Sequence, residues 1–119
     1  VFDNSGKLET TSLLDNWEQQ RFEISGDEVK TSSSCQYYLA SAANSNYICA
    51  LYLGKFPAEM ESMSMEDARM EIHVWNWAGE LVATYIPDSL VMKIAIAEDN
   101  TIYATSPLDD MHIYSYKLK

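Results

Sequence analysis

Apolar and polar residues alternate with a period close to two through most of this chain, a pattern typical of β-strands. The apolar segments are short, and turn signals such as Ala78-Gly79 separate them. A helix is predicted only over 60–70. The predicted strands of the second half of the chain are 72–77, 80–86, 90–97, 101–105 and 112–118.

The pattern also repeats. Residues 1–15 match 74–88 at an offset of 73, sharing Val, Gly, Leu, Thr and Asp at equivalent positions. Residues 38–50 match 92–104 at an offset of 54. Two matches in the same order, each bounded by turns, indicate an internal repeat.

Within this repeat, Tyr114 is predicted to occupy the position of Trp75 and Phe2. His73 and His112 are predicted to begin the third strand of adjacent copies.

The repeating unit is a four-stranded antiparallel meander, and such units in tandem are typical of a β-propeller. We therefore predict an all-β fold of about two and a half propeller blades. Residues 1–14 end one blade, 15–88 form a full blade with two long loops, and 89–119 form the last blade. Both faces of a blade are packed, which accounts for consecutive apolar residues such as Val74-Trp75.

Charge narrows the classes of partner. The chain has 119 residues, with 8 Lys and Arg against 18 Asp and Glu, for a net charge of −10. The length suits one domain. Nucleic acids and anionic membranes are poor partners because both are bound through basic groups, whereas metal cations and basic partners remain possible. No apolar run reaches the 18 residues of a membrane-spanning helix.

The two cysteines are predicted on the strands of one hairpin whose turn is 44–46. Pairing about Ser45 would place Cys49 opposite Ser41 and Cys35 opposite Lys55. The thiols are then too far apart for a disulfide, and we expect both to be reduced and buried. No Cys or Cys/His spacing typical of a metal site occurs.

Three stretches resemble one family. Residues 47–55, YICALYLGK, resemble the YIYALYSGK stretch of TolB-like six-bladed propellers from Bacteroides-type bacteria, and 72–80, IHVWNWAGE, resemble that family's I-x-V-F-D-x-x-G strand pair. Residues 99–104 and 113–116 resemble its last blade. The departures from the family pattern are Cys49, Leu53 and Trp77.

The likeness covers 36–119 well and 1–35 loosely, and its motifs are structural. It implies an exported lipoprotein, periplasmic or anchored to the outer membrane, of poorly known function.

Two connections are longer than their counterparts in the next repeat, namely 16–35 and 54–71. In a meander both lie at the same end of the strands, so we predict a binding face there. Its candidate ligand-binding residues are Asp15, Trp17, Arg21, Phe22, Phe56, Glu59, Glu61 and Asp88.

Each group of these side chains has a second interpretation. The aromatic residues either stack on a sugar or peptide or pin the loop to the blade. The acidic run from Glu59 to Asp67 either binds Ca²⁺ or is solvated. Met60, Met63, Met65 and Met70 form a soft-metal site, an adaptable surface or a packed helix. Asp15 and Asp88 either cap turns or face a central channel.

The predicted function is a non-catalytic binding or scaffold module for an unknown protein, peptide or glycan. No catalytic motif occurs, and no cofactor is predicted. The alternative is a lactonase-like or esterase-like propeller hydrolase with a divalent cation in the channel, for which only Asp15 and Asp88 qualify at one end and Glu98 or Asp99 at the other. A complete small β-domain is a third possibility. Open blade edges would also permit self-association.

Overall fold

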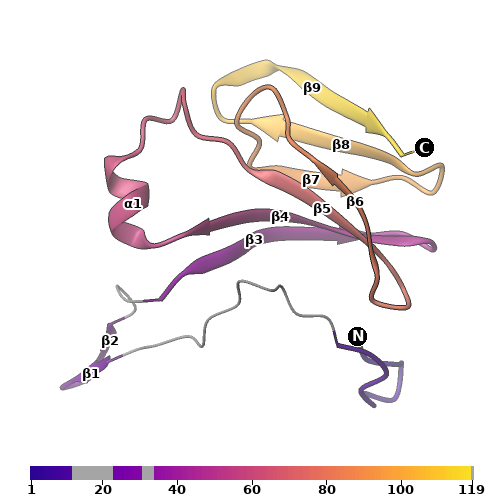
Figure 1. Ribbon diagram of the computed structural model, residues 1–119, viewed down its shortest axis with the longest axis horizontal. Coiled ribbons are helices and arrows are strands. Elements are labelled where there is room, and N and C mark those ends of the chain that lie inside the picture. The colour runs from indigo at the N-terminus through magenta and orange to yellow at the C-terminus, as the bar shows by residue number, and fades with distance from the viewer. Residues whose placement is uncertain (12–22, 31–33, 119) are drawn as a thin grey trace.

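The computed structural model describes residues 1–11, 23–30 and 34–118 (Figure 1). It confirms the all-β fold of tandem antiparallel meanders. The elements are β1 Glu23–Ser25, β2 Glu28–Lys30, β3 Gln36–Ala43, β4 Tyr47–Lys55, α1 Pro57–Ser62, β5 Glu71–Asn76, β6 Leu81–Tyr85, β7 Lys93–Ile96, β8 Thr101–Ser106 and β9 Asp109–Lys117.

Two sheets make up the body of the molecule. Strands β3, β4, β5 and β6 pair in sequence order, as do β7, β8 and β9, and every pairing is antiparallel. Strands β1 and β2 form a separate two-stranded hairpin whose residues are all exposed. The four-stranded and three-stranded sheets fall within the ranges predicted as the full blade and the last blade.

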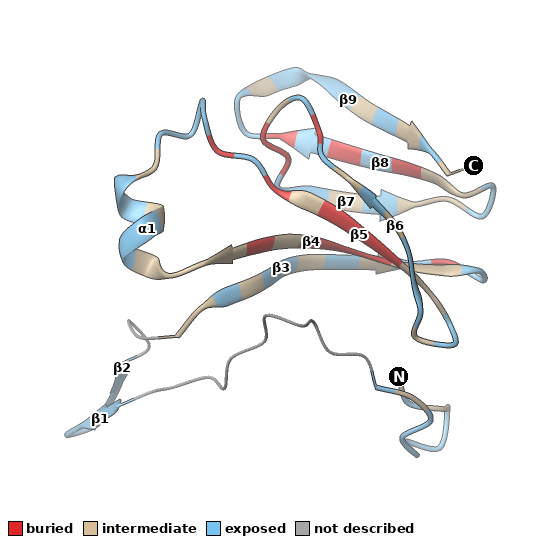
Figure 2. Ribbon diagram, in the orientation of Figure 1, coloured by how far each residue is buried: buried red, intermediate tan, exposed pale blue. Residues whose placement is uncertain are grey.

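A single apolar layer joins the two sheets. Leu51 and Ile72 from the first sheet and Ile102 from the second are fully buried in one core cluster, which Val91 of the β6–β7 connection completes. Figure 2 shows this buried layer along β4, β5 and β8. Burying each of these side chains contributes about 1.5–3 kcal/mol, so the shared layer holds the two meanders together.

The N-terminal segment repeats the β5–β6 hairpin in miniature. Phe2 pairs with Leu8 in an isolated antiparallel bridge, and Trp75 pairs with Leu81 at positions 73 residues later. Two strands are predicted over 1–14. Among the described residues of that range, the structure has only this bridge in their place.

The turns of these two hairpins match in detail. The side-chain Oδ1 of Asp3 and of Asn76 accepts the N–H four residues later, at 2.9 and 3.0 Å. Gly6 and Gly79 then take φ values of 82° and 85°, which glycine adopts without steric cost. The hydrogen bonds and dihedral angles confirm the repeat at an offset of 73.

Asn44 ties the β3–β4 turn to the β7–β8 turn. Its Nδ2 donates to the carbonyl of Ala97 at 2.7 Å and to Oδ1 of Asn100 at 2.9 Å. Its Oδ1 accepts the N–H groups of Asn46 and Tyr47 at 2.9 and 2.8 Å. The buried Asn44 side chain therefore makes all four bonds inside the protein.

This use of Asn44 corrects the predicted hairpin register. Ala43 pairs with Ile48, so the turn has four residues and is not centred on Ser45. Cys49 consequently lies opposite Ala42 instead of Ser41. Because the side chain of Asn44 caps the turn, the centre of the turn lies between Ser45 and Asn46, half a residue later than predicted.

The cysteine prediction is otherwise confirmed in part. No disulfide joins the two cysteines, and Cys49 is buried, but Cys35 is only half-buried. Cys35 lies just before β3, because Gln36 is the residue that pairs with Lys55 after two register shifts.

The predicted repeat of aromatic residues is wrong by two positions. Trp75 pairs with Ile48, and at an offset of 54 the equivalent Ile102 pairs with Tyr116. Tyr116 therefore takes the place of Trp75. The spacing of β5 and β9 differs because the β4–β5 connection is long and the β8–β9 connection is a two-residue turn.

The same register separates the two histidines. His73 pairs with Ala50, and the equivalent Ala104 pairs with Tyr114. Tyr114 thus stands at the position of His73, and His112 does not.

The helix also differs from its prediction over 60–70, because α1 ends at Ser62. No helix in the described part of the chain is long and apolar enough to span a bilayer.

Asn44→Ala should lower the free energy of unfolding by about 2–3 kcal/mol, because it removes the four hydrogen bonds of a buried side chain and leaves partly buried backbone groups without a partner. Urea denaturation measures the loss. Asn46→Ala, at an exposed position of the same turn, is the matched control and should cost less than about 1 kcal/mol. Equal losses in the two variants would contradict the role given to Asn44.

Burial raises the pKa of the Cys49 thiol to about 11, and the thiolate is the reactive form. In a Cys35→Ser variant, a disulfide reagent at pH 8 should therefore label the native chain on the order of 100-fold more slowly than the denatured chain. Equal labelling rates in the two states would show that Cys49 is accessible.

Candidate functional site

The candidate site lies at the end of the sheets opposite the Asn44 turn. The β3–β4, β5–β6 and β7–β8 turns lie toward the right in Figure 1, whereas α1 lies toward the left. The long β4–β5 connection and the β6–β7 connection both belong to the left-hand end, as strand alternation requires.

Local sequence signals build α1. Pro57 occupies the first turn, where its missing N–H costs nothing. Glu59 Oε2 accepts the N–H of Phe56 at 2.8 Å. After the helix ends, the N–H groups of Asp67 and Ala68 bond to the carbonyl of Ser64 and turn the chain toward β5.

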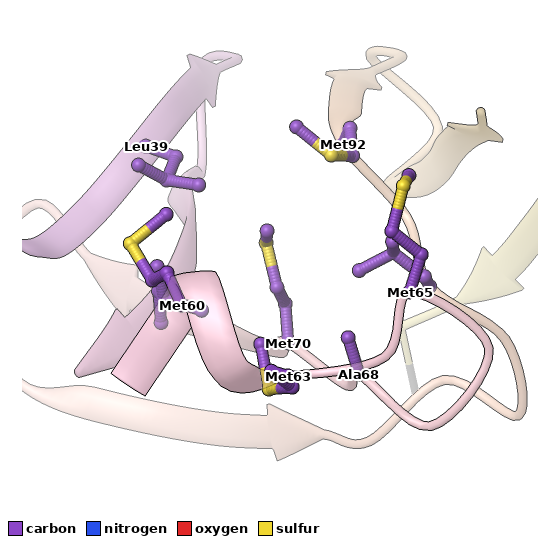
Figure 3. A pocket seen from close by; sticks show the side chains of 9 residues that line it. Leu39, Met60, Met63, Met65, Ala68, Met70 and Met92 are labelled. Atoms are coloured by element: carbon purple, nitrogen blue, oxygen red, sulfur yellow. The ribbon is translucent and has the colours of Figure 1, made fainter. Parts of the chain in front are cut away.

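A pocket of about 140 Å³ opens between these connections and the sheet. Five of the six methionines of the chain line it. Figure 3 shows their side chains arranged around the opening. The full lining is Leu39, Leu53, Met60, Met63, Met65, Ala68, Met70, Leu90 and Met92, so every lining side chain is apolar.

The pocket has a buried floor and an exposed rim. Ala68, Met70 and Leu90 are at most 4% exposed. Met65 and Met92 are 51% and 41% exposed. An unbranched thioether chain can change rotamer to fit different apolar shapes, so the rim can adjust to whatever enters.

Most of the predicted site residues lie elsewhere. Asp15, Trp17, Arg21 and Phe22 lie outside the described residues. Of the others, Phe56 is half-buried beside α1, while Glu59, Glu61 and Asp88 are exposed, and none of these four lines the pocket. Their role in binding stays a prediction, and Glu59 has a structural role as a helix cap.

Sequence reasoning singled out four of the pocket methionines but not the site that they form. Met92 and Leu39 were missed because neither belongs to a long connection. The available signal is the concentration of methionine in the sequence: five of the six methionines lie in 60–92.

A second group of polar and aromatic side chains forms a hydrogen-bonded network across the first sheet. Glu71 Oε2 lies 2.8 Å from His73 Nε2, and His73 Nδ1 lies 3.0 Å from the Tyr38 hydroxyl. Tyr52 stacks on the imidazole with ring centroids 4.6 Å apart. A carboxylate–imidazole–hydroxyl chain has the composition of a catalytic triad.

Burial and neighbouring groups set the protonation of the Tyr38 hydroxyl in this network. Burial, with added repulsion from Tyr52 and Glu71, raises the pKa of Tyr38 to about 12. The hydroxyl therefore stays protonated at neutral pH and donates to Nδ1 of His73. With Nε2–H donating to Glu71, both ring nitrogens of His73 have a hydrogen-bond partner.

Within the described ranges, no three His, Cys, Asp or Glu side chains lie close enough together to hold a metal ion. Comparison with known proteins finds no matching family model, curated protein or solved structure.

Above pH 10 the fold should lose stability, because the pKa of Tyr38 is higher in the folded state than the value near 10 of an unfolded chain. The contribution of Tyr38 is complete below pH 10 and declines as the pH approaches 12. Urea denaturation at pH 9 and 11.5 should show a smaller decline for Tyr38→Phe than for the wild type. Tyr103→Phe, on the other sheet, is the control, and an unchanged decline in Tyr38→Phe would contradict this assignment.

Proposed function

We propose that this chain is a non-catalytic binding module, built as part of a β-propeller, that holds an apolar group of its ligand in the methionine-lined pocket. The observation that carries the proposal is the convergence of Met60, Met63, Met65, Met70 and Met92 on one opening. Ligand sites are typically concave and lined mainly by apolar side chains, and this opening has both properties.

The size of the pocket sets the class of group. An apolar cavity of about 150 Å³ stays dry and binds benzene or xenon, and this pocket has about 140 Å³. One phenyl ring or one branched aliphatic side chain therefore fits. A larger ligand would place the rest of its surface outside, on α1 and the β6–β7 connection.

The propeller part of the proposal is supported by packing. Strand β7 lies against β3 and β4, as the inner strands of neighbouring blades do. The far face of the second sheet leaves Tyr103, Met111 and Ile113 exposed. In a propeller another blade covers such a face, and the resemblance to TolB-like propellers supports this arrangement and an exported protein.

The hydrolase alternative receives less support. Its cation would need several carboxylates around one axis, but Asp88 is exposed and Asp15 lies outside the described residues.

Benzene is a direct probe of the pocket. At a concentration of about five times its Kd, benzene should stabilise the folded chain by about 1 kcal/mol and raise the Tm by a few degrees. Met65→Gln with Met92→Gln should remove most of this increase, because two amides then have to be desolvated at the rim.

Met111→Gln is the matched control, since Met111 is 82% exposed and lies outside the pocket. It should leave the increase unchanged. A Tm increase that is the same in the double variant as in the wild type would place the benzene site elsewhere and contradict the proposal.

A further inference from the structure

We infer that the occupant of the methionine-lined pocket is a basic peptide segment that inserts one apolar side chain. This inference rests on the proposed function and names the partner for it. Two observations support it, namely the charge around the opening and the size of the space within.

Exposed carboxylates lie on the connections that supply the pocket methionines. Glu61, Glu66 and Asp67 are exposed on the same connection that supplies Met60, Met63 and Met65. In the part of the chain that the structure describes, none of these carboxylates forms an ion pair with a lysine or arginine. Glu59 on α1 and Asp88 on the β6–β7 connection are also exposed, which makes five exposed carboxylates on these two connections.

The one basic residue between Pro57 and Met70 is Arg69. Its Nη1 donates to the carbonyl oxygens of Glu66 and Ala68 at 2.9 and 2.7 Å. The guanidinium therefore bonds to backbone groups, and among the described residues it forms no ion pair with a neighbouring carboxylate.

An apolar opening with carboxylates around it favours a ligand that has an apolar group flanked by positive charges. A free neutral hydrocarbon would leave the carboxylates unused, and a nucleic acid or anionic lipid would be repelled by them and by the net charge of −10. A peptide with one apolar residue between lysines or arginines places its side chain in the pocket and its charges near the carboxylates. Flexible methionine side chains suit such peptides because they adapt to different apolar residues.

The test compares three fluorescein-labelled pentapeptides by fluorescence anisotropy at about 20 mM salt. Lys-Lys-Phe-Lys-Lys should bind at least about tenfold more tightly than Glu-Glu-Phe-Glu-Glu or Lys-Lys-Ala-Lys-Lys. At about 0.5 M salt, screening should reduce the advantage over the acidic peptide severalfold.

Charge reversal locates the contact. Glu61→Lys should weaken binding of Lys-Lys-Phe-Lys-Lys severalfold while leaving the benzene-induced Tm increase unchanged. Glu9→Lys changes the same charge on the exposed N-terminal segment, away from α1 (Figure 1), and should leave peptide binding as in the wild type.

Each outcome has one meaning. If the basic peptide binds no more tightly than the acidic one, or no more tightly than the alanine peptide, while benzene still raises the Tm, this inference is wrong and the proposed function stands. If benzene also leaves the Tm unchanged, both fail. Equal weakening by Glu61→Lys and Glu9→Lys would show a general charge effect and overturn the assigned contact.

Discussion

Packing between the two sheets is the interaction on which the rest of the structure depends. Leu51 and Ile72 on one meander share a buried layer with Ile102 on the other. A sheet with one apolar face must bury that face against another layer, and each of these two sheets supplies that layer for the other. The layer therefore fixes how the two meanders face each other and where their connections meet.

The two ends of this layer differ in a way that creates the site. At one end Asn44 bonds to Ala97 and Asn100 and closes the short turns onto each other. At the other end the chain needs residues 56–70 to return from β4 to β5. This longer connection covers the end of the core irregularly, with thioethers in place of the close fit of branched side chains, and a pocket remains.

Much of the fold could be predicted from the sequence because its signals are local. Gly6 and Gly79 mark the same turn in two copies, and the structure gives them nearly the same φ. The hairpin register was predicted wrongly because it depends on the side chain of Asn44, which residue type alone does not place. The helix begins before the predicted range of 60–70 because Pro57 and Glu59 mark its start.

The pocket was harder to predict because it is not local. Leu39 and Met92 are 53 positions apart and meet only after both sheets have formed. The four methionines of the β4–β5 connection were visible in the sequence, but whether they pack as a helix or border a space depends on the sheet below them. The binding residues predicted from loop length rested on position alone, which does not say where a side chain points.

The central claim is that five methionines share one ligand site and the sixth does not. The most direct measurement is a spectrum of the chain labelled with ¹³C at the methionine methyl groups, recorded during titration with benzene. The account predicts that the signals of Met60, Met63, Met65, Met70 and Met92 shift together along one binding curve while that of Met111 stays in place. A shift of Met111 as large as the others, or no shift of the five, would contradict it.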